Sequence, residues 1–126
     1  MPKQIKNTHK LKAILLHIIN SIGAKYNGGK AVILTILYFI EVEFYQKYEE
    51  KLMGLTYTKE EQDPVPEEFD DAIKEMEDNG EIITITTGFD DHRQYRYLAL
   101  KKENLSGLSK QEIDVAEGVT GRLSGP

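Results

Sequence analysis

The stretch DPVPEEFDDAIKEMEDNGEIITITTGFDDHRQYRYLAL, residues 63–100, decides the fold, because it sets a helix directly before a pair of strands. Pro66 suits the first turn of a helix, where its missing N–H costs nothing, and Asn79-Gly80 suits a left-handed end. The pattern therefore predicts a helix from Pro66 to Asn79. Its expected core stripe is Phe69, Ala72, Ile73 and Met76.

Two strand-like runs follow this helix. EIITITT, residues 81–87, and RQYRYLAL, residues 93–100, are rich in β-branched and aromatic residues. GFDDH, residues 88–92, lies between them and has the length and glycine content of a hairpin loop. The sequence therefore predicts a β-hairpin after the helix.

Further helices are predicted on both sides of this unit. Residues 8–22 carry apolar side chains at helical spacing, and residues 30–48 are apolar on every side in their first half, which predicts a central helix wrapped by the rest of the domain. The run LTYT, residues 55–58, predicts a short extended strand. Ser109 with Glu112 forms a capping-box pattern that predicts a final helix.

The expected fold class is therefore α+β and mostly helical. The order is helix, helix, short strand, helix, β-hairpin and C-terminal helix, which is a winged-helix-like core. We expect residues 1–126 to form a single domain, because this length buries enough surface for one core. A fold analogy alone does not give the function.

Charge and composition restrict the class of protein. The chain has no cysteine, 40% hydrophobic residues and a net charge of -5, which fits a cytoplasmic globular domain. Residues 1–40 hold six lysines and no acid, which indicates either a basic partner surface or, as we favour, complementarity to the acidic remainder. The apolar run near the N-terminus resembles a secretory signal peptide, but Lys12 and His17 interrupt it, so we do not expect one. Residues 31–40 are apolar but too short to span a membrane.

No catalytic, cofactor or metal pattern is evident. His9, His17 and His92 match no metal-ligand spacing. Glu41 and Glu43 are two residues apart, so on a helix their carboxylates do not converge on one substrate atom. We therefore predict no enzyme activity, no cofactor and no metal.

The predicted helix at residues 66–79 is strongly acidic, with seven carboxylates and one lysine, Lys74. Its outward face is centred on Glu67, Asp71, Lys74 and Asp78. In a DNA-binding winged helix this face would meet phosphates, which Lys and Arg neutralise. DNA binding through this helix is therefore not expected, and the face is either a solvated surface or a site for a protein partner.

The alternative function is a winged-helix DNA-binding transcriptional regulator. It would have to contact DNA through the basic first third of the chain or through basic residues of the hairpin region. Those residues are Arg93, Arg96, Lys101 and Lys102.

Residues 34–82, LTILYFIEVEFYQKYEEKLMGLTYTKEEQDPVPEEFDDAIKEMEDNGEI, resemble the Panacea domain of SocA-like antitoxins of type II toxin–antitoxin systems. The matching features are an apolar helix ending in LYF, the run FYQKYEEKL, Gly54 with Tyr57 three residues later, and a Pro-x-Pro entry to an acidic helix ending in NGEI. Members usually carry glycine where Asp63 stands, and a closing Ser-His-containing segment that is not found before Pro126 here. We therefore expect a copy that is either divergent or truncated at its C-terminus.

The resemblance implies a prokaryotic or phage antitoxin that neutralises a partner toxin by direct binding, and in some members an adaptor that presents the toxin for proteolysis. The acidic helix suggests that the toxin is basic. No membrane partner is expected, and the oligomeric state stays open. The expected partner-binding residues are Tyr57, Asp63, Pro64, Pro66, Glu67, Glu68, Asp71 and Asp78.

Overall fold

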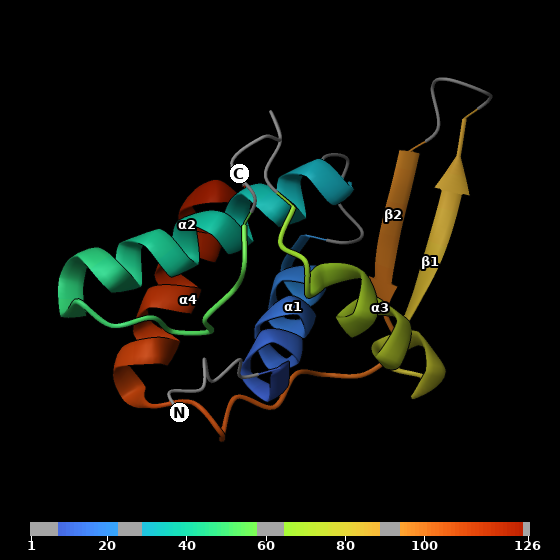
Figure 1. Cartoon of the computed structure of the whole chain (residues 1–126). Coiled ribbons are helices and arrows are strands. Elements are labelled where there is room, and N and C mark those ends of the chain that lie inside the picture. The colour runs from blue at the N-terminus through green and yellow to red at the C-terminus, as the bar shows by residue number, and fades with distance from the viewer. Residues whose placement is uncertain (1–7, 23–28, 58–64, 89–93, 125–126) are drawn as a thin grey trace, which may run out of the picture.

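The computed structural model describes residues 8–22, 29–57, 65–88 and 94–124 (Figure 1). The order of its elements confirms the predicted, mostly helical α+β class, with four helices and one antiparallel hairpin in the described ranges. The elements are α1 (Thr8–Ile22), α2 (Lys30–Tyr48), α3 (Phe69–Asp78), β1 (Ile82–Thr87), β2 (Gln94–Ala99) and α4 (Lys110–Leu123).

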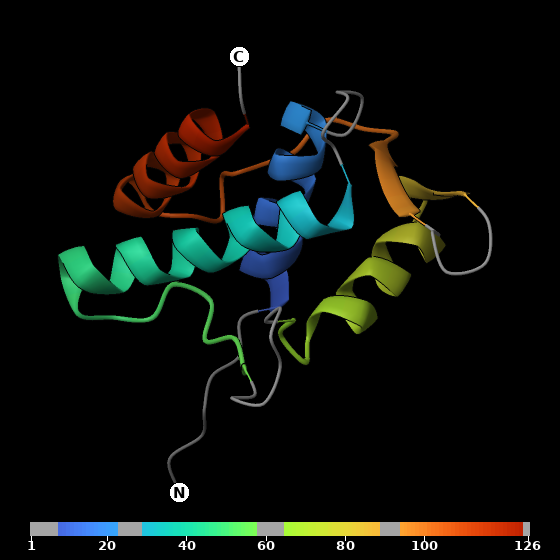
Figure 2. The same ribbon diagram turned by 90° about the horizontal axis from the view of Figure 1, so that it is seen from above.

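Helix α1 is the central helix, so the prediction that α2 would be wrapped by the domain is wrong. Helix α1 contacts α2, α3, α4 and β2, and Figure 2 shows it between the α2–α4 pair and the hairpin with α3. Its lysines are not a solvated stripe, because Lys10 pairs with Glu112 of α4 and Lys12 pairs with Glu75 of α3, both at 2.5 Å. The aliphatic part of a lysine side chain can pack against neighbouring helices while its ammonium group reaches a carboxylate near the protein surface.

Helix α2 has the predicted bounds, but one side of it is exposed. Tyr38, Phe39 and Tyr45 keep 37, 45 and 53% of their surface accessible. The helix ends at Tyr48, where Glu49 takes a left-handed conformation with φ 57° and its N–H bonds to the Tyr45 carbonyl at 2.7 Å. Helix α2 therefore ends six residues before Gly54.

Helix α3 begins at Phe69, three residues later than predicted. Pro66 to Glu68 form a turn in which the Phe69 N–H bonds to the Pro66 carbonyl at 3.1 Å. The helix ends as predicted at the Asn79-Gly80 pair: Glu81 N–H bonds to Met76 O, and Gly80 N–H bonds to Glu77 O. With Gly80 at φ +74°, these two bonds make a Schellman motif.

The predicted hairpin is confirmed, with β1 antiparallel to β2 and Ile82 opposite Ala99. Its inner side chains include Ile82 and Tyr97, which are buried in the core. On its far side β2 forms a single bridge between Arg96 and Gly29 at the start of α2. The hairpin thus contacts α1 and α2 through β2 and α3 through β1.

The predicted short strand at residues 55–58 is not present in its described part, residues 55–57. No neighbouring strand pairs with these residues. Instead, the Leu55 N–H bonds to a Glu41 carboxylate oxygen at 3.1 Å, and the Thr56 N–H bonds to Glu68 at 3.0 Å. Side chains therefore satisfy backbone groups that a sheet would otherwise pair.

Helix α4 begins at the predicted capping box. The Glu112 N–H bonds to Ser109 Oγ at 3.1 Å, and the Ser109 N–H bonds to Glu112 Oε1 at 2.8 Å. The helix continues through Gly118 to Leu123. Val115, Ala116 and Val119 are buried, so packing against α1 and α2 outweighs the low helix propensity of glycine.

Candidate partner-binding surface

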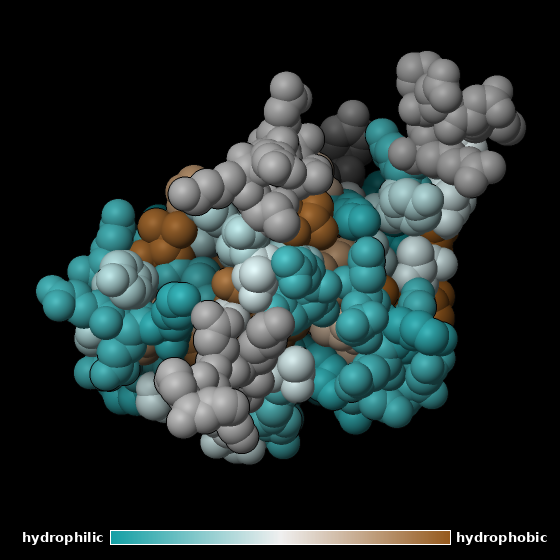
Figure 3. All heavy atoms as spheres, viewed as in Figure 1, coloured by the Kyte–Doolittle hydropathy of each residue, from teal (hydrophilic) through white to brown (hydrophobic). Residues whose placement is uncertain are grey.

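The acidic face of α3, formed by Glu67, Asp71 and Asp78 around Lys74, is exposed along its length. Figure 3 shows a broad hydrophilic area over α3. Lys74 neutralises only one of these acids, Asp78, at 3.6 Å, with both side chains about two-thirds or more exposed. A net negative surface therefore remains available to a partner.

The opposite face of α3 is firmly packed. Phe69 is fully buried and meets the Tyr97 ring edge-on with 6.3 Å between centroids, and Lys30 lies 5.4 Å from its ring centre. Asp70 and Asp71 in the first turn favour the positive end of the helix dipole. The helix can therefore present its acids from a fixed position. The remaining buried residues of α3 are Ala72, Ile73 and Met76.

Glu41 fixes the segment that leads toward α3. One of its carboxylate oxygens accepts the Met53 N–H at 2.9 Å, and the other accepts the N–H groups of Gly54 and Leu55 at 2.9 and 3.1 Å. Hydrogen bonds to a charged acceptor are about twice as strong as neutral ones. This role could not be predicted from local patterns, because the contacts span 12 to 14 residues.

A second set of bonds joins this segment to the start of α3. Thr56 donates its N–H to Glu68 Oε1 at 3.0 Å, and its carbonyl accepts the Glu67 N–H at 2.9 Å. Pro66 is buried beside them. We call residues 52–57 together with 65–68 the junction. Because the junction holds Glu67, it ties α2 to the first residue of the acidic face.

Tyr57 ends the described part of the junction. Its ring meets Tyr38 of α2 edge-on at 5.5 Å, and Tyr38 in turn meets Phe39 at 5.5 Å. The Tyr57 hydroxyl is buried without a hydrogen-bond partner in the described part of the chain. Burial, followed by the nearby charge of Glu41 and the Tyr38 and Glu68 side chains, raises the pKa of this hydroxyl well above its ordinary value, so it stays protonated.

The structure divides the predicted partner-binding residues into three groups. Glu67, Asp71 and Asp78 are exposed together on the acidic face. Pro66, Glu68 and Tyr57 lie in the junction, where they are buried or half-buried. Asp63 and Pro64 lie outside the described residues.

The exposed aromatics of α2 were not among the predicted residues. Tyr38 and Phe39 adjoin the junction, whereas Tyr45 lies two turns further along the same helix. Because the first half of α2 is apolar on every side, the sequence predicted that this helix would be buried. In the structure α1 takes the central position instead, so one side of α2 is exposed to solvent. Aromatic side chains are common anchors in protein interfaces.

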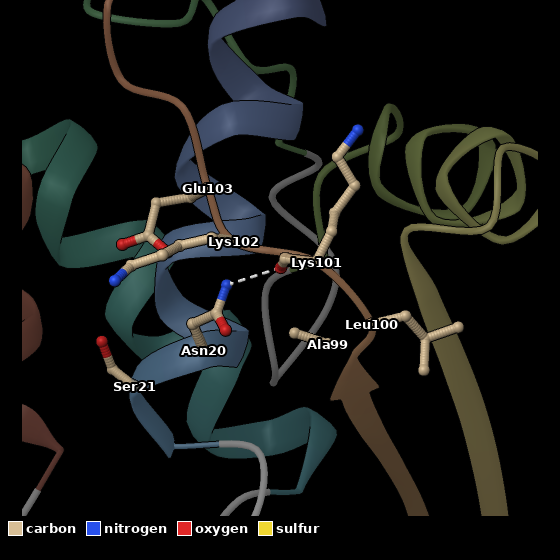
Figure 4. Close-up of a pocket in the computed structure, with 7 residues that line it drawn as sticks. All are labelled: Asn20, Ser21, Ala99, Leu100, Lys101, Lys102 and Glu103. Atoms are coloured by element: carbon tan, nitrogen blue, oxygen red, sulfur yellow. Dashed lines mark hydrogen bonds between the residues drawn. The ribbon is translucent and has the colours of Figure 1, made fainter.

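A surface depression of about 540 Å³ lies between the end of α1 and the chain after β2. Figure 4 shows its side chains spreading in different directions: Lys101 points away from Asn20, whose side chain bonds to the Lys101 carbonyl at 3.1 Å. A ligand site needs polar groups that converge. Among the described residues no group of His, Asp or Glu could hold a metal, and no described helix is long and apolar enough to cross a membrane.

A scan against family models matches residues 34–125 to the model described as antitoxin SocA-like, Panacea domain. The match covers well over half of the chain, including α2 from residue 34 onward, the junction, α3, the hairpin and α4. The chain belongs to this SocA-like antitoxin family. Neither the search of curated proteins nor the search of solved structures found a match.

Membership in the Panacea family confirms the resemblance seen in the sequence and indicates a toxin–antitoxin role. It implies a toxin as partner in general terms, and the family is not known for enzymes. Helix α1 precedes the matched range, yet it forms the centre of the core on which the matched elements pack.

Proposed function

We propose that this Panacea domain is an antitoxin that neutralises a basic toxin by direct contact, through the acidic face of α3 and the adjoining segment from Leu55 to Val65. The observation that carries the proposal is the charge of residues 66–79, with seven acids and one lysine, on a helix whose apolar side is buried. A fixed, exposed surface of one sign is suited to a partner of the opposite sign.

The packing of α3 separates structural acids from those free to meet a partner. Glu68 is committed to the junction, and Glu75 pairs with Lys12 of α1. Glu67 and Asp71 have no ion pair in the described part of the chain, and Asp78 has only the exposed contact with Lys74. Such exposed pairs contribute about 0–1 kcal/mol, so a partner's cations can replace them at little cost.

The same charge argues against DNA as the ligand of α3. Binding to duplex DNA draws most of its affinity from phosphate neutralisation by Lys and Arg. The lysines of α1 that could have supplied a basic surface, Lys10 and Lys12, are engaged with Glu112 and Glu75. The internal pairing favoured from the sequence thus removes two cations from any nucleic-acid surface.

The test begins with co-purification of the tagged protein from its own host. A small protein recovered in stoichiometric amount is then expressed alone and together with this chain. The proposal expects growth arrest when it is expressed alone and recovery on co-expression. A co-purified protein that leaves growth unaffected, or arrest that co-expression does not relieve, would contradict it.

A charge-reversal variant tests the surface itself. Glu67→Lys, Asp71→Lys and Asp78→Lys together change the acidic face while leaving its buried stripe intact. We expect loss of toxin binding in a variant whose circular dichroism matches the parent. The matched control reverses three exposed acids far from α3, Glu50, Asp114 and Glu117, and should bind normally. Equal affinity of both variants would rule out the α3 face.

The adaptor role is a finer part of the proposal. If the domain presents its toxin to a protease in the cytoplasm, the toxin's half-life in the host should shorten when the domain is co-expressed. The acidic-face variant should restore a long half-life. A half-life independent of the domain would limit its action to neutralisation by binding.

A further inference from the structure

Strand β1 forms an open edge of the hairpin. Strand β2 is paired on both sides, with β1 and through Arg96 with Gly29. Strand β1 pairs only with β2 within the described ranges. In Figure 1 it is the outermost strand, on the side away from α2 and α4.

The register shows which backbone groups point outward from this edge. The Leu100 N–H bonds to the Glu81 carbonyl at 2.7 Å, one step before the Ile82–Ala99 pair. In an antiparallel ladder, hydrogen-bonded and non-bonded pairs alternate, so Ile83 and Ile85 bond to β2. The N–H and C=O groups of Ile82, Thr84 and Thr86 therefore point away from the sheet. No hydrogen bond between described residues reaches them.

The two faces of β1 differ in chemistry. On the inner face, the Thr84 hydroxyl donates a hydrogen bond to the Glu77 carboxylate of α3. On the outer face, Ile83 and Ile85 are exposed at 42 and 38%. A strand added at this edge would therefore have a carboxylate beside one face and apolar side chains beside the other.

Nothing within β1 protects the edge. Proteins usually block an exposed edge strand with a lysine, a proline, a bulge or an inward-facing charge. The sequence IITITT at residues 82–87 has no charge, no proline and no glycine, and its pairing with β2 is regular. An open edge of strong β-formers is a template for strand addition.

We propose that the β1 edge binds an extended segment of the partner toxin by strand addition, with basic residues on one face of that segment and β-branched apolar residues on the other. This inference rests on the proposed function and identifies a second part of the same interface. Glu77 supports the basic face, because it lies beside Thr84 and has no ion pair among the described residues. Glu81, just before the strand, also adds negative charge, because its ion pair with Lys101 is long, at 3.8 Å.

A second copy of this chain suits the edge less well. In a symmetric dimer the two β1 strands would pair around Thr84. The Glu77 carboxylate of each copy, bonded to its own Thr84, would then lie beside that of the other copy. Like charges at that separation oppose pairing. A basic segment instead neutralises Glu77 while its outer side chains cover Ile83 and Ile85.

The test uses the full-length protein and a short synthetic peptide in which lysine and valine alternate. Titration should give binding, with slowed hydrogen exchange at the amides of Thr84 and Thr86. A peptide with glutamate in place of lysine should not bind. A third peptide, N-methylated on the edge that would face β1, should bind at least about tenfold more weakly, since losing two hydrogen bonds costs about 1.4 kcal/mol or more.

A variant of the protein provides the complementary test. Thr86→Pro removes an outward N–H without removing a bond to β2, and proline is tolerated at such edge positions. Thr86→Val keeps the N–H and is the matched control. We expect Thr86→Pro, which loses one hydrogen bond, to weaken peptide binding about threefold or more and Thr86→Val to preserve it, with the Ile83 and Ile85 amides protected in both.

The inference would be overturned by no peptide binding, by binding without protection of the Thr84 and Thr86 amides, or by concentration-dependent self-association that Thr86→Pro abolishes. The peptide assay contains no toxin, so its failure would leave the neutralisation test and the acidic-face variant unaffected. If Thr86→Pro prevents the hairpin from forming and the peptide still binds, the peptide cannot be adding to β1, and strand addition would likewise be refuted.

Discussion

Replacing Glu41 with alanine should destabilise the domain more than any other single change to an acidic side chain of α2. Its carboxylate accepts three backbone N–H groups, from Met53, Gly54 and Leu55, at 2.9 to 3.1 Å. After truncation these half-buried donors have no acceptor. The junction that they anchor also carries Thr56, which bonds to Glu67 and Glu68 at the start of α3.

The magnitude follows from the three bonds. A hydrogen bond to a charged group contributes about 1.5–3 kcal/mol, and partial exposure here favours the lower value. Glu41→Ala should therefore lower the free energy of unfolding by about 4 kcal/mol, which shifts a urea midpoint by roughly 2 M. Glu41→Gln keeps an acceptor for Gly54 and Leu55 but turns an amide N–H toward Met53, so its expected loss is about 1–2 kcal/mol.

Urea denaturation followed by circular dichroism measures both variants, and Glu43→Ala is the matched control. Glu43 lies on the same helix, and its ion pairs within the described ranges are with exposed cations, Arg122 at 2.5 Å and Lys47 at 3.6 Å. Its removal should cost less than about 1 kcal/mol. If Glu41→Ala and Glu43→Ala differed by less than about 0.5 kcal/mol, the three bonds could not stabilise the junction as argued.

Two further predictions concern local features. Glu49→Gly should raise the free energy of unfolding by about 0.5 kcal/mol, because φ 57° is strained for a side chain and free for glycine; a decrease would show that the Glu49 side chain stabilises the end of α2. Burial raises the pKa of Glu103, but its hydrogen bond with His17 at 2.8 Å and its own backbone lower it more, so the net shift is downward. The resulting stability is present above the ordinary glutamate pKa of about 4.3 and is lost as the pH falls through the lowered value. Glu103→Gln should therefore flatten the acid side of the pH–stability profile, whereas Glu117→Gln should leave it steep; identical profiles would contradict the coupling.

Local sequence patterns predicted those parts of the fold whose causes are local. The periodicity of residues 8–22 and 30–48 gave both helices their observed bounds. The Asn79-Gly80 pair and the Ser109–Glu112 box mark helix ends through bonds that span only a few residues. In each case the residues that specify the element also make its contacts.

The missed features depend on contacts between distant residues. The Pro66–Glu68 turn replaces a first helical turn because Glu67 and Glu68 bond to Thr56, which periodicity within the acidic run cannot indicate. The central position of α1 depends on the contacts of its buried side chains with α2, α3, α4 and β2, which no pattern within residues 8–22 can indicate. Of the expected partner-binding residues, the outward positions on α3 followed from spacing alone, whereas the junction positions required the tertiary bonds.

Charge decides what the helix before the hairpin can bind. A helix in this position is directed at phosphates in DNA-binding winged-helix proteins. Here α3 precedes the hairpin but carries acids on its exposed side, and Glu77 extends that charge to Thr84 at the middle of β1. The acidic face and the strand edge are therefore adjacent and share one electrostatic sign. One basic chain could meet both, with side chains on α3 and backbone on β1. Because strand addition uses backbone hydrogen bonds, the β1 edge would require of its partner's sequence only basic residues that alternate with apolar ones.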